Sequence, residues 1–431
     1  MYYCLSQIDG SIRLDKQLQL EIKKDRQIWK FCAYGFLKNL QFFEPYLFIY
    51  LLGKGMNLFD IGILFGISQL ITYIFEIPSG IIADLIGKKK ELSMCFVFYI
   101  ISFILFFFVK DFKLAVLAMV FFGLGEAFRS GTHKAMIYKY LELKGWEKHK
   151  VYVYGRTRSY SLKGSAISSI LAIILILNIP SSNYIFLITV IPYILDLLLI
   201  LSYPSELDRP DSKKTGSVYR MIKDHLLGIF KKPELRRILL NSASFDGFIS
   251  ICKDYIQPIL EAIILASGLV VISSMSADDN LKIILGLVYF VINILGSAGS
   301  KRIYKASKYL SSDKLMNLFY LALIICFFIM AISIKFQWTL LIILAFIILR
   351  LSRDMRKPIF VDHCDHFMDK SERATVLSID SQLKAFIIII LSPALGFIAE
   401  NYGMDNAMFI IGIILSVLYA FVRINHKKAQ M

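Results

Sequence analysis

Charged residues are scarce in this sequence, making up only 19% of its 431 residues, whereas soluble proteins contain about 25%. Hydrophobic residues make up 57%, and the mean hydropathy is +0.61. A soluble chain of this size could not bury so much apolar surface, and apolar runs long enough to cross a bilayer recur along its whole length. We therefore interpret the sequence as an all-α polytopic membrane protein. This excludes a soluble enzyme, a nucleic-acid-binding protein and a secreted disulfide-rich protein.

Several other features are absent. The six cysteines are scattered and no two are spaced as C-x-x-C, so we infer no disulfide framework. No G-x-x-x-x-G-K-[ST] sequence occurs, which argues against an ATP-driven pump, and nothing indicates a cofactor. Residues 1–29 lack an apolar core, so we expect no cleavable signal peptide. Acidic residues number 33 against 49 basic ones, giving a net charge of +16. The basic residues lie in short segments between apolar runs, which indicates contact with membrane lipids rather than nucleic acid.

Twelve segments are predicted to be spanning helices, because a helix needs about 20 apolar residues to cross a bilayer. They are 31–53, 60–86, 91–109, 113–140, 154–178, 184–203, 238–265, 281–300, 314–334, 338–361, 375–399 and 404–424. Hydropathy alone is expected to miss the fourth, seventh and tenth, which charges interrupt. Basic residues gather in alternate connecting segments, so the positive-inside rule places both termini in the cytoplasm. We expect a multi-pass protein of the inner (plasma) membrane, and a monomer.

The longest polar stretch divides the spans into two groups of six. Residues 204–237 carry nine basic residues, and 219–230 have the pattern of an amphipathic helix on the inner membrane surface. The predicted units are an N-terminal cytoplasmic segment (1–29), a first six-helix bundle (30–203), a basic linker (204–237), a second six-helix bundle (238–425) and a cytoplasmic tail (426–431). Six spans, a basic linker and six more spans is typical of a two-bundle transporter.

A short motif separates the second and third spans. It contains Gly80, Asp84, Gly87, Lys88 and Lys89. Gly80 allows a close helix approach, and Gly87 permits a tight turn. Asp84 can cap a helix or pair with a basic neighbour, while the lysines hold the loop at the anionic inner surface.

This motif resembles the G-x-x-x-D-x-x-G-[RK]-[RK] signature of the major facilitator superfamily, which lies between the same two spans. Leu85 departs from it, since the family has a basic residue there. The resemblance implies two six-helix bundles related by pseudo-two-fold symmetry. It also implies that the motif is a gating latch between the bundles on the cytoplasmic side. Glu76 lies close to the motif, and we assign it to the same gate. The alternative is an ordinary basic turn after a helix.

Charges within the predicted spans are concentrated in the first, fourth, seventh and tenth. These residues are Lys38, Glu44, Glu126, Arg129, Asp246, Lys253, Asp254, Arg350, Arg353 and Asp354. An intramembrane charge costs about 2.5–3.5 kcal/mol on insertion scales, so each is a hypothesis of function. The resemblance implies that these same four helices line a central cavity. We therefore assign the ten residues to a cavity between the bundles.

Glu126 and Arg129 are the predicted proton-coupling pair. Their i, i+3 spacing places both side chains on one helix face. A carboxyl group in a cavity can carry a proton, and a neighbouring arginine can hold an anion or release the proton. Glu44 and Asp254 are the rival carriers. The alternative is a static ion pair that only neutralises itself.

A second group of charges lies toward the predicted cytoplasmic side. Arg156 and Arg158 open the fifth span, and Asp380 and Lys384 lie in the eleventh. We interpret these four residues as an inner gate between the bundles. Contact with anionic lipid headgroups is an equally good alternative.

Segment 362–369 contains metal-ligand types at the end of the tenth span. Asp362, His363 and His366 form a weak candidate site for a divalent metal. The two histidines are not at i, i+4, so a solvated helix end is the better interpretation, and we predict no metal site.

Together these features predict a secondary active transporter rather than an enzyme. It would move a small molecule or ion by alternating access, coupled to protons. The alternatives are a facilitator or a divalent-metal exporter that uses segment 362–369. An intramembrane enzyme or a receptor on a transporter fold has less support, because no nucleophile–base arrangement is visible.

Overall fold

A computed structural model describes residues 18–208, 233–267, 272–306, 310–364, 367 and 373–424, and the regular elements of this part of the chain are all helical. Residues 18–24 are helical and precede α2. The first bundle contains α2 (Arg26–Lys38), α3 (Leu47–Leu52), α4 (Leu58–Ile86), α5 (Lys88–Phe108), α6 (Phe112–Arg129), α7 (Thr132–Leu143), η1 (Glu147–His149), α8 (Lys150–Asn178) and α9 (Tyr184–Leu201), followed by η2 (Ser205–Asp208). The second bundle contains α11 (Pro233–Ser267), α12 (Ala277–Ala306), α13 (Ser312–Lys335), α14 (Thr339–Cys364), α15 (Arg373–Tyr402) and α16 (Met404–Val422). The predicted amphipathic helix at 219–230 lies outside the described residues.

Eight helices of the described chain are long and apolar enough to cross a membrane. They are α4, α5, α8, α9, α12, α13, α15 and α16. The remaining predicted spans are the first (α2 and α3), fourth (α6 and α7), seventh (α11) and tenth (α14). Each of them is helical, and these are the four spans that carry the intramembrane charges. Hydropathy therefore misses the fourth, seventh and tenth as expected, and also the first, which is broken.

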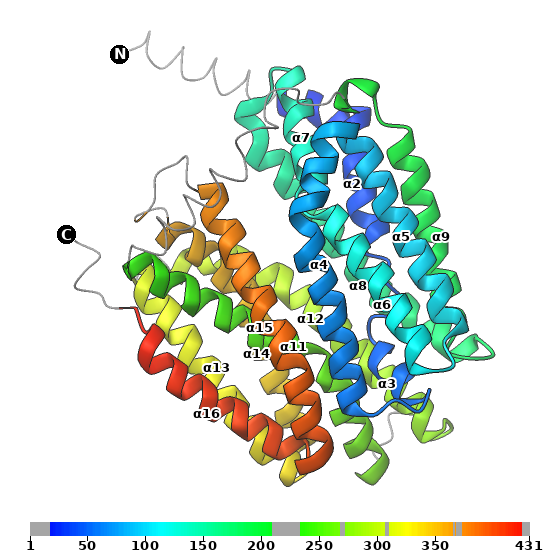
Figure 1. The fold of residues 1–431 in the computed structure, drawn as a ribbon, viewed down its shortest axis with the longest axis vertical. Helices are drawn as coiled ribbons and strands as arrows, with labels where there is room; N and C mark the ends of the chain where they lie inside the picture. The colour runs from blue at the N-terminus through cyan, green and yellow to red at the C-terminus, as the bar shows by residue number, and fades with distance from the viewer. Residues whose placement is uncertain are drawn as a thin grey trace.

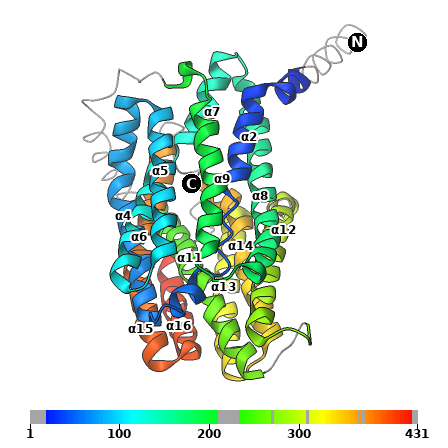
Figure 2. The ribbon, with the colours of Figure 1, turned by 90° about the vertical axis from the view of Figure 1, so that its right-hand side faces the viewer.

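Two predicted spans are interrupted rather than continuous. In the first, α2 ends at Lys38 and α3 begins at Leu47, with a non-helical stretch between them that contains Pro45 (Figure 2). In the fourth, α6 ends at Arg129 and α7 begins at Thr132, because Gly131 adopts a positive φ of 77°. A positive φ is readily accessible only to glycine, so this residue sets the bend. Both breaks lie beside charged side chains.

The two bundles meet mainly along the antiparallel pair α4 and α15, with a second contact between α8 and α12 and a smaller one between α3 and α11. We call the face where α2 begins and α16 ends the termini face, and the face where α3 ends and α4 begins the opposite face. Figure 1 shows α4 and α15 close together at the opposite face and apart toward the termini face.

Glycines allow the close approach of α4 and α15 near the opposite face. A Cβ atom at Gly62 would lie 2.6 Å from the Ser392 carbonyl oxygen, and one at Gly396 would lie 2.4 Å from that of Leu58. Small residues at such crossings let helix backbones come into direct contact. At Gly80, toward the termini face, a Cβ atom would meet nothing within 4 Å in the described part of the chain. The bundles are therefore packed at the opposite face and separated at the termini face.

Candidate functional site

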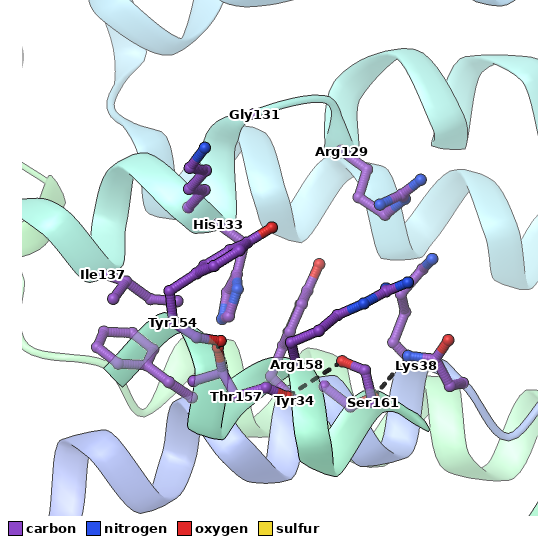
Figure 3. Close-up of a pocket in the computed structure, with 14 residues that line it drawn as sticks. Tyr34, Lys38, Arg129, Gly131, His133, Ile137, Tyr154, Thr157, Arg158 and Ser161 are labelled. Atoms are coloured by element: carbon purple, nitrogen blue, oxygen red, sulfur yellow. Dashed lines mark hydrogen bonds between the residues drawn. The ribbon is translucent and has the colours of Figure 1, made fainter. Parts of the chain in front are cut away.

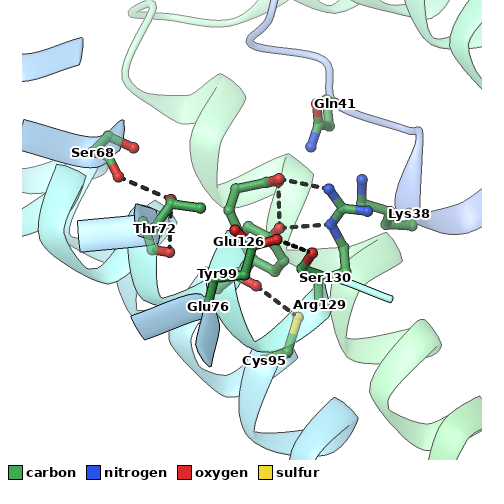
Figure 4. Close-up of polar contacts among 12 residues, drawn as sticks. Lys38, Gln41, Ser68, Thr72, Glu76, Cys95, Tyr99, Glu126, Arg129 and Ser130 are labelled. Atoms are coloured by element: carbon green, nitrogen blue, oxygen red, sulfur yellow. Dashed lines mark hydrogen bonds and ion pairs between the residues drawn. The ribbon is translucent and has the colours of Figure 1, made fainter. Parts of the chain in front are cut away.

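An ion pair in the first bundle joins the end of α6 to α5 (Figure 4). Arg129 Nη2 lies 2.6 Å from Glu126 Oε2, and the Tyr99 hydroxyl donates to Glu126 Oε1 at 2.5 Å. Arg129 Nε also donates to the Tyr99 oxygen at 3.2 Å. The side chains of Arg129 and Glu126 remain 31% and 28% exposed. The pair is thus held in place by Tyr99 but stays accessible to a ligand.

The broken ends of the first and fourth spans converge on this pair. Lys38 ends α2 and Arg129 ends α6, and Lys38 interacts electrostatically with Glu126. The Tyr193 hydroxyl donates to the Lys38 carbonyl at 3.0 Å, and Gln41 Nε2 donates to the Tyr193 oxygen at 2.6 Å. Side-chain hydrogen bonds thus satisfy backbone groups that the missing helix turn leaves unpaired.

A cavity of about 250 Å³ opens beside Arg129 in the first bundle (Figure 3). It is lined by Phe31, Tyr34, Gly35, Lys38, Asn39, Arg129, Gly131, His133, Lys134, Ile137, Tyr154, Thr157, Arg158 and Ser161. We call it the cationic pocket, because its lining contains four basic side chains and no carboxylate. The rings of Tyr34 and His133 stack inside it, with centroids 3.6 Å apart.

A second charged group bridges the two bundles. Lys253 Nζ of α11 lies 3.8 Å from Glu44 Oε1 in the break of the first span and 3.6 Å from Asp254 Oδ1. Arg350 of α14 interacts electrostatically with Asp254. The structure therefore brings together four of the predicted cavity residues at the junction of three spans.

Gln257 of α11 holds the broken first span to the second bundle. Its Oε1 accepts a hydrogen bond from the Phe48 backbone N–H at 2.9 Å. Its Nε2 donates to the Glu44 carbonyl and to the Tyr289 hydroxyl, each at 3.0 Å. The Tyr46 hydroxyl adds a contact to the Lys282 carbonyl at 3.0 Å. The fully buried Gln257 side chain thus joins the two bundles on the side toward the opposite face.

The remaining predicted cavity charges lie within the second bundle. Asp246 interacts electrostatically with Arg353, and also with Asp380 and Lys384 of the predicted inner gate. Asp354 instead packs over Gly296 of α12, where a Cβ atom would lie 2.5 Å from its Oδ2.

The predicted inner-gate residues of the two bundles have different neighbours. Arg156 donates to the Lys23 carbonyl at 3.0 Å, and its guanidinium lies 4.9 Å from the centroid of the Trp29 ring. Arg158 faces the cationic pocket, whereas Asp380 and Lys384 belong to the Asp246 group. In this arrangement Arg156 packs against the helices that begin the chain, because the bundles are apart at the termini face.

Glu76 joins α4 to the second bundle on the side of Gly62 and Gly66 that lies toward the termini face. Its carboxylate accepts from Ser130 Oγ at 2.8 Å and from Gln382 Nε2 of α15 at 2.6 Å. Beyond it α4 leaves α15, so Gly80 is exposed and Asp84 is half-buried. The predicted latch motif therefore has no close neighbour in α15 at Gly80.

The turn after Asp84 is held from within the first bundle. Gly87 has a φ of 102°, and Asp208 Oδ1 accepts from the backbone N–H groups of Lys89 at 3.0 Å and Lys90 at 3.3 Å. Lys89 Nζ donates to the Tyr203 carbonyl at 2.9 Å. Asp208 thus caps the start of α5, a role that its sequence position gives no reason to expect.

The weak metal candidate has little geometric support. His366 lies outside the described residues, and Asp362 accepts a hydrogen bond from Ser312 Oγ at 2.7 Å. In the described part of the chain no group of three potential metal ligands is found.

The sequence did not indicate three residues of these clusters: Tyr34, Tyr99 and Asp208. Tyr99 lies in the third span, which has no charge near its middle, so no intramembrane charge marks it. The two tyrosines share a sequence signal only in retrospect, since both are polar aromatic residues inside a span.

Comparisons with known proteins agree with this architecture. Residues 30–386 match the family model of the Major Facilitator Superfamily. The chain is 23% identical over 426 residues to YxaM of Bacillus subtilis (strain 168), an uncharacterised MFS-type transporter, covering 93% of this chain and 98% of YxaM. The crystal structure of the nucleoside transporter NupG is similar with a TM-score of 0.77 at 14% identity, over 93% of this chain and 99% of that one. A D-xylose–proton symporter is similar with a TM-score of 0.70 at 12% identity, over 94% and 98%.

Proposed function

This chain belongs to the major facilitator superfamily, and from that premise we propose that it is a secondary active transporter that moves a small solute by alternating access. The observation that carries the proposal is the asymmetric packing of the bundles, tight from Leu58 to Glu76 along α4 and open at Gly80. We take both termini as cytoplasmic in a bacterial plasma membrane, so this arrangement is open to the inside.

The proposed solute path runs between the bundles, past the charged groups at the breaks of the first and fourth spans. Intramembrane charges mark substrate and proton pathways in transporters. Broken helices near the midplane supply polar backbone groups to the same region. Glu44 and Lys253, on different bundles, would separate when the opposite face opens, because their 3.8 Å contact spans the junction.

For coupling we propose that Glu126 carries the proton. With Arg129 and Tyr99 as partners, its carboxylate is stabilised as the anion. If Arg129 is drawn away by a ligand, the carboxylate loses its charged partner and takes up a proton. Binding of solute and proton would then be linked through a single guanidinium group.

The Glu126→Gln variant is expected to lose accumulation driven by a pH gradient while keeping solute exchange. The amide keeps the shape of the side chain but cannot carry a proton. Proteoliposomes with purified protein would be offered labelled nucleosides, sugars, amino acids and organic ions, with and without a gradient. Glu142→Gln, at an exposed position of α7, is the matched control and should behave as wild type. Gradient-driven uptake that survives Glu126→Gln would transfer the role to Glu44 or Asp254. Uptake of no labelled solute by the wild type would contradict the transporter proposal.

The Asp84→Asn variant tests the latch. We propose that Asp84 forms its productive contact when the bundles close at the termini face, since here it is only half-buried. The variant is expected to lose about tenfold or more in transport rate, the equivalent of about 1.4 kcal/mol, with solute affinity nearly unchanged. Parallel binding and uptake measurements would separate the two quantities. A comparable loss of affinity would contradict a gating role.

A further inference from the structure

We infer that the solute is a small organic anion with a planar ring, and that the cationic pocket binds it. This inference deepens the proposed function and rests on it. The volume of about 250 Å³ is slightly below the range of about 300–1,000 Å³ that holds drug-sized ligands, which fits a small molecule.

The charge of the pocket is the first support. Lys38, Lys134 and Arg158 line it together with Arg129. Among the described residues only Arg129 of these four is in an ion pair, the one with Glu126. Lys38 also interacts electrostatically with Glu126 and Asp196, whereas Lys134 and Arg158 face a cavity whose lining has no carboxylate. Unbalanced charge in a membrane span is costly. An anionic ligand would supply the missing negative charge, and it would compete with Glu126 for Arg129.

The hydrogen-bonding groups of the pocket are a second and independent support. The Tyr34 hydroxyl is on a side chain that is only 5% exposed, and it has no hydrogen-bond partner in the described chain. His133 Nε2 is likewise without a partner there. Both atoms lie on side chains that line the pocket but are themselves covered by neighbouring atoms, so each would gain a hydrogen-bond partner if its side chain turned toward a bound ligand. Tyr34 can donate to an anionic oxygen.

The aromatic surface of the pocket favours a planar ligand. Tyr34 and His133 are already stacked, and Tyr154 lies across the pocket with Lys134 Nζ 5.2 Å from its ring centroid. A ligand whose planar ring lies against these side chains gains stacking contact, while its anionic group reaches Lys38 and Arg158. The mixed polar lining offers no continuous apolar track for an acyl chain, so we favour a dissolved anion over a lipid headgroup.

The test compares ligands that share a ring and differ in charge. Purified full-length protein in phosphatidylcholine nanodiscs is mixed at millimolar concentration with benzoate, phenyl phosphate, benzyl alcohol or benzylamine. The two anions are expected to raise the melting temperature, and the neutral and cationic compounds are not. Arg158→Gln and Lys38→Gln are each expected to weaken anion binding about tenfold, because each removes a charge-assisted hydrogen bond to the anion.

Arg156→Gln is the matched control, since Arg156 lies two residues from Arg158 on α8 but contacts Trp29 instead of the pocket. It should leave anion binding unchanged, and Arg158→Lys should restore part of it. The inference is overturned if neither anion stabilises the protein, if benzylamine or benzyl alcohol does so equally, or if Arg156→Gln weakens binding as much as Arg158→Gln.

Nanodiscs with phosphatidylglycerol distinguish a lipid occupant. Stabilisation by this lipid that depends on Arg158, without an effect of benzoate, would assign the pocket to a headgroup and overturn the inference. Different results would contradict the transporter proposal and the anion inference. Anion binding without uptake in proteoliposomes would contradict the transporter, whereas uptake of only neutral or cationic solutes would contradict the anion inference alone.

Discussion

The Gly396→Val variant is expected to transport at least about tenfold more slowly than wild type. A Cβ atom there meets the Leu58 carbonyl oxygen at 2.4 Å and Phe59 Cα at 3.0 Å. Both are backbone atoms, so the clash is relieved only if α4 and α15 separate near the opposite face. Overpacking of this kind costs about 1–3 kcal/mol, and 1.4 kcal/mol already shifts a two-state equilibrium tenfold. The variant is therefore expected to favour a state that is open at the opposite face and to slow the return to the state in which that face is closed.

Gly80→Val is the matched control on the same pair of helices. A Cβ atom at Gly80 would meet no atom of the described residues within 4 Å, so the substitution should chiefly destabilise a state in which α4 and α15 close at the termini face. A Ser161→Cys reporter in the cationic pocket, in a cysteine-free background, would report both shifts by its rate of alkylation. Relative to the reporter protein without a second substitution, the alkylation rate should fall in Gly396→Val and stay the same or rise in Gly80→Val. Unchanged labelling and transport in Gly396→Val would show that this crossing does not open during the cycle.

The Gln257→Ala variant is expected to lower the free energy of unfolding by about 2–4 kcal/mol. The fully buried amide forms three hydrogen bonds, two of them to backbone groups in the first span. Its removal leaves the Phe48 N–H and the Glu44 carbonyl without their partner, at about 1–3 kcal/mol for each buried group. Denaturant or thermal unfolding in detergent would measure the loss.

A second amide between the bundles, Gln382, provides the comparison. Among the described residues Gln382 makes a single hydrogen bond, to Glu76, and it is only half-buried. Gln382→Ala is therefore expected to cost about 0.5–1.5 kcal/mol. Equal losses in the two variants would mean that the break of the first span is stabilised elsewhere.

The helical architecture could be predicted from the sequence because its cause is local. Apolar length marks each span, and the free energy needed to place a charge in the bilayer makes residues such as Glu126 and Lys253 conspicuous. The i, i+3 spacing of Glu126 and Arg129 likewise predicted a pair that the structure contains at 2.6 Å. Their role in coupling stays a prediction.

The helix breaks and the gate contacts could not be predicted, because their causes are distant in sequence. Pro45 signals an irregularity, but α2 ends at Lys38 because Tyr193 and Gln257 satisfy the freed backbone groups. The neighbours of Arg156 follow from the separation of the bundles at the termini face, which no local sequence pattern encodes.

The attachment of the first span to Gln257 has a consequence for the order of assembly. The N–H of Phe48 finds its acceptor 209 residues later in the chain. When the first six spans have left the ribosome, α3 still lacks that acceptor, and unsatisfied backbone groups are not tolerated in hydrocarbon. The part of the first span near the opposite face must therefore remain hydrated or be sheltered by the insertion machinery until α11 is synthesised. The first bundle therefore lacks this hydrogen bond when it is synthesised, and the bond can form only after α11 of the second bundle has been made.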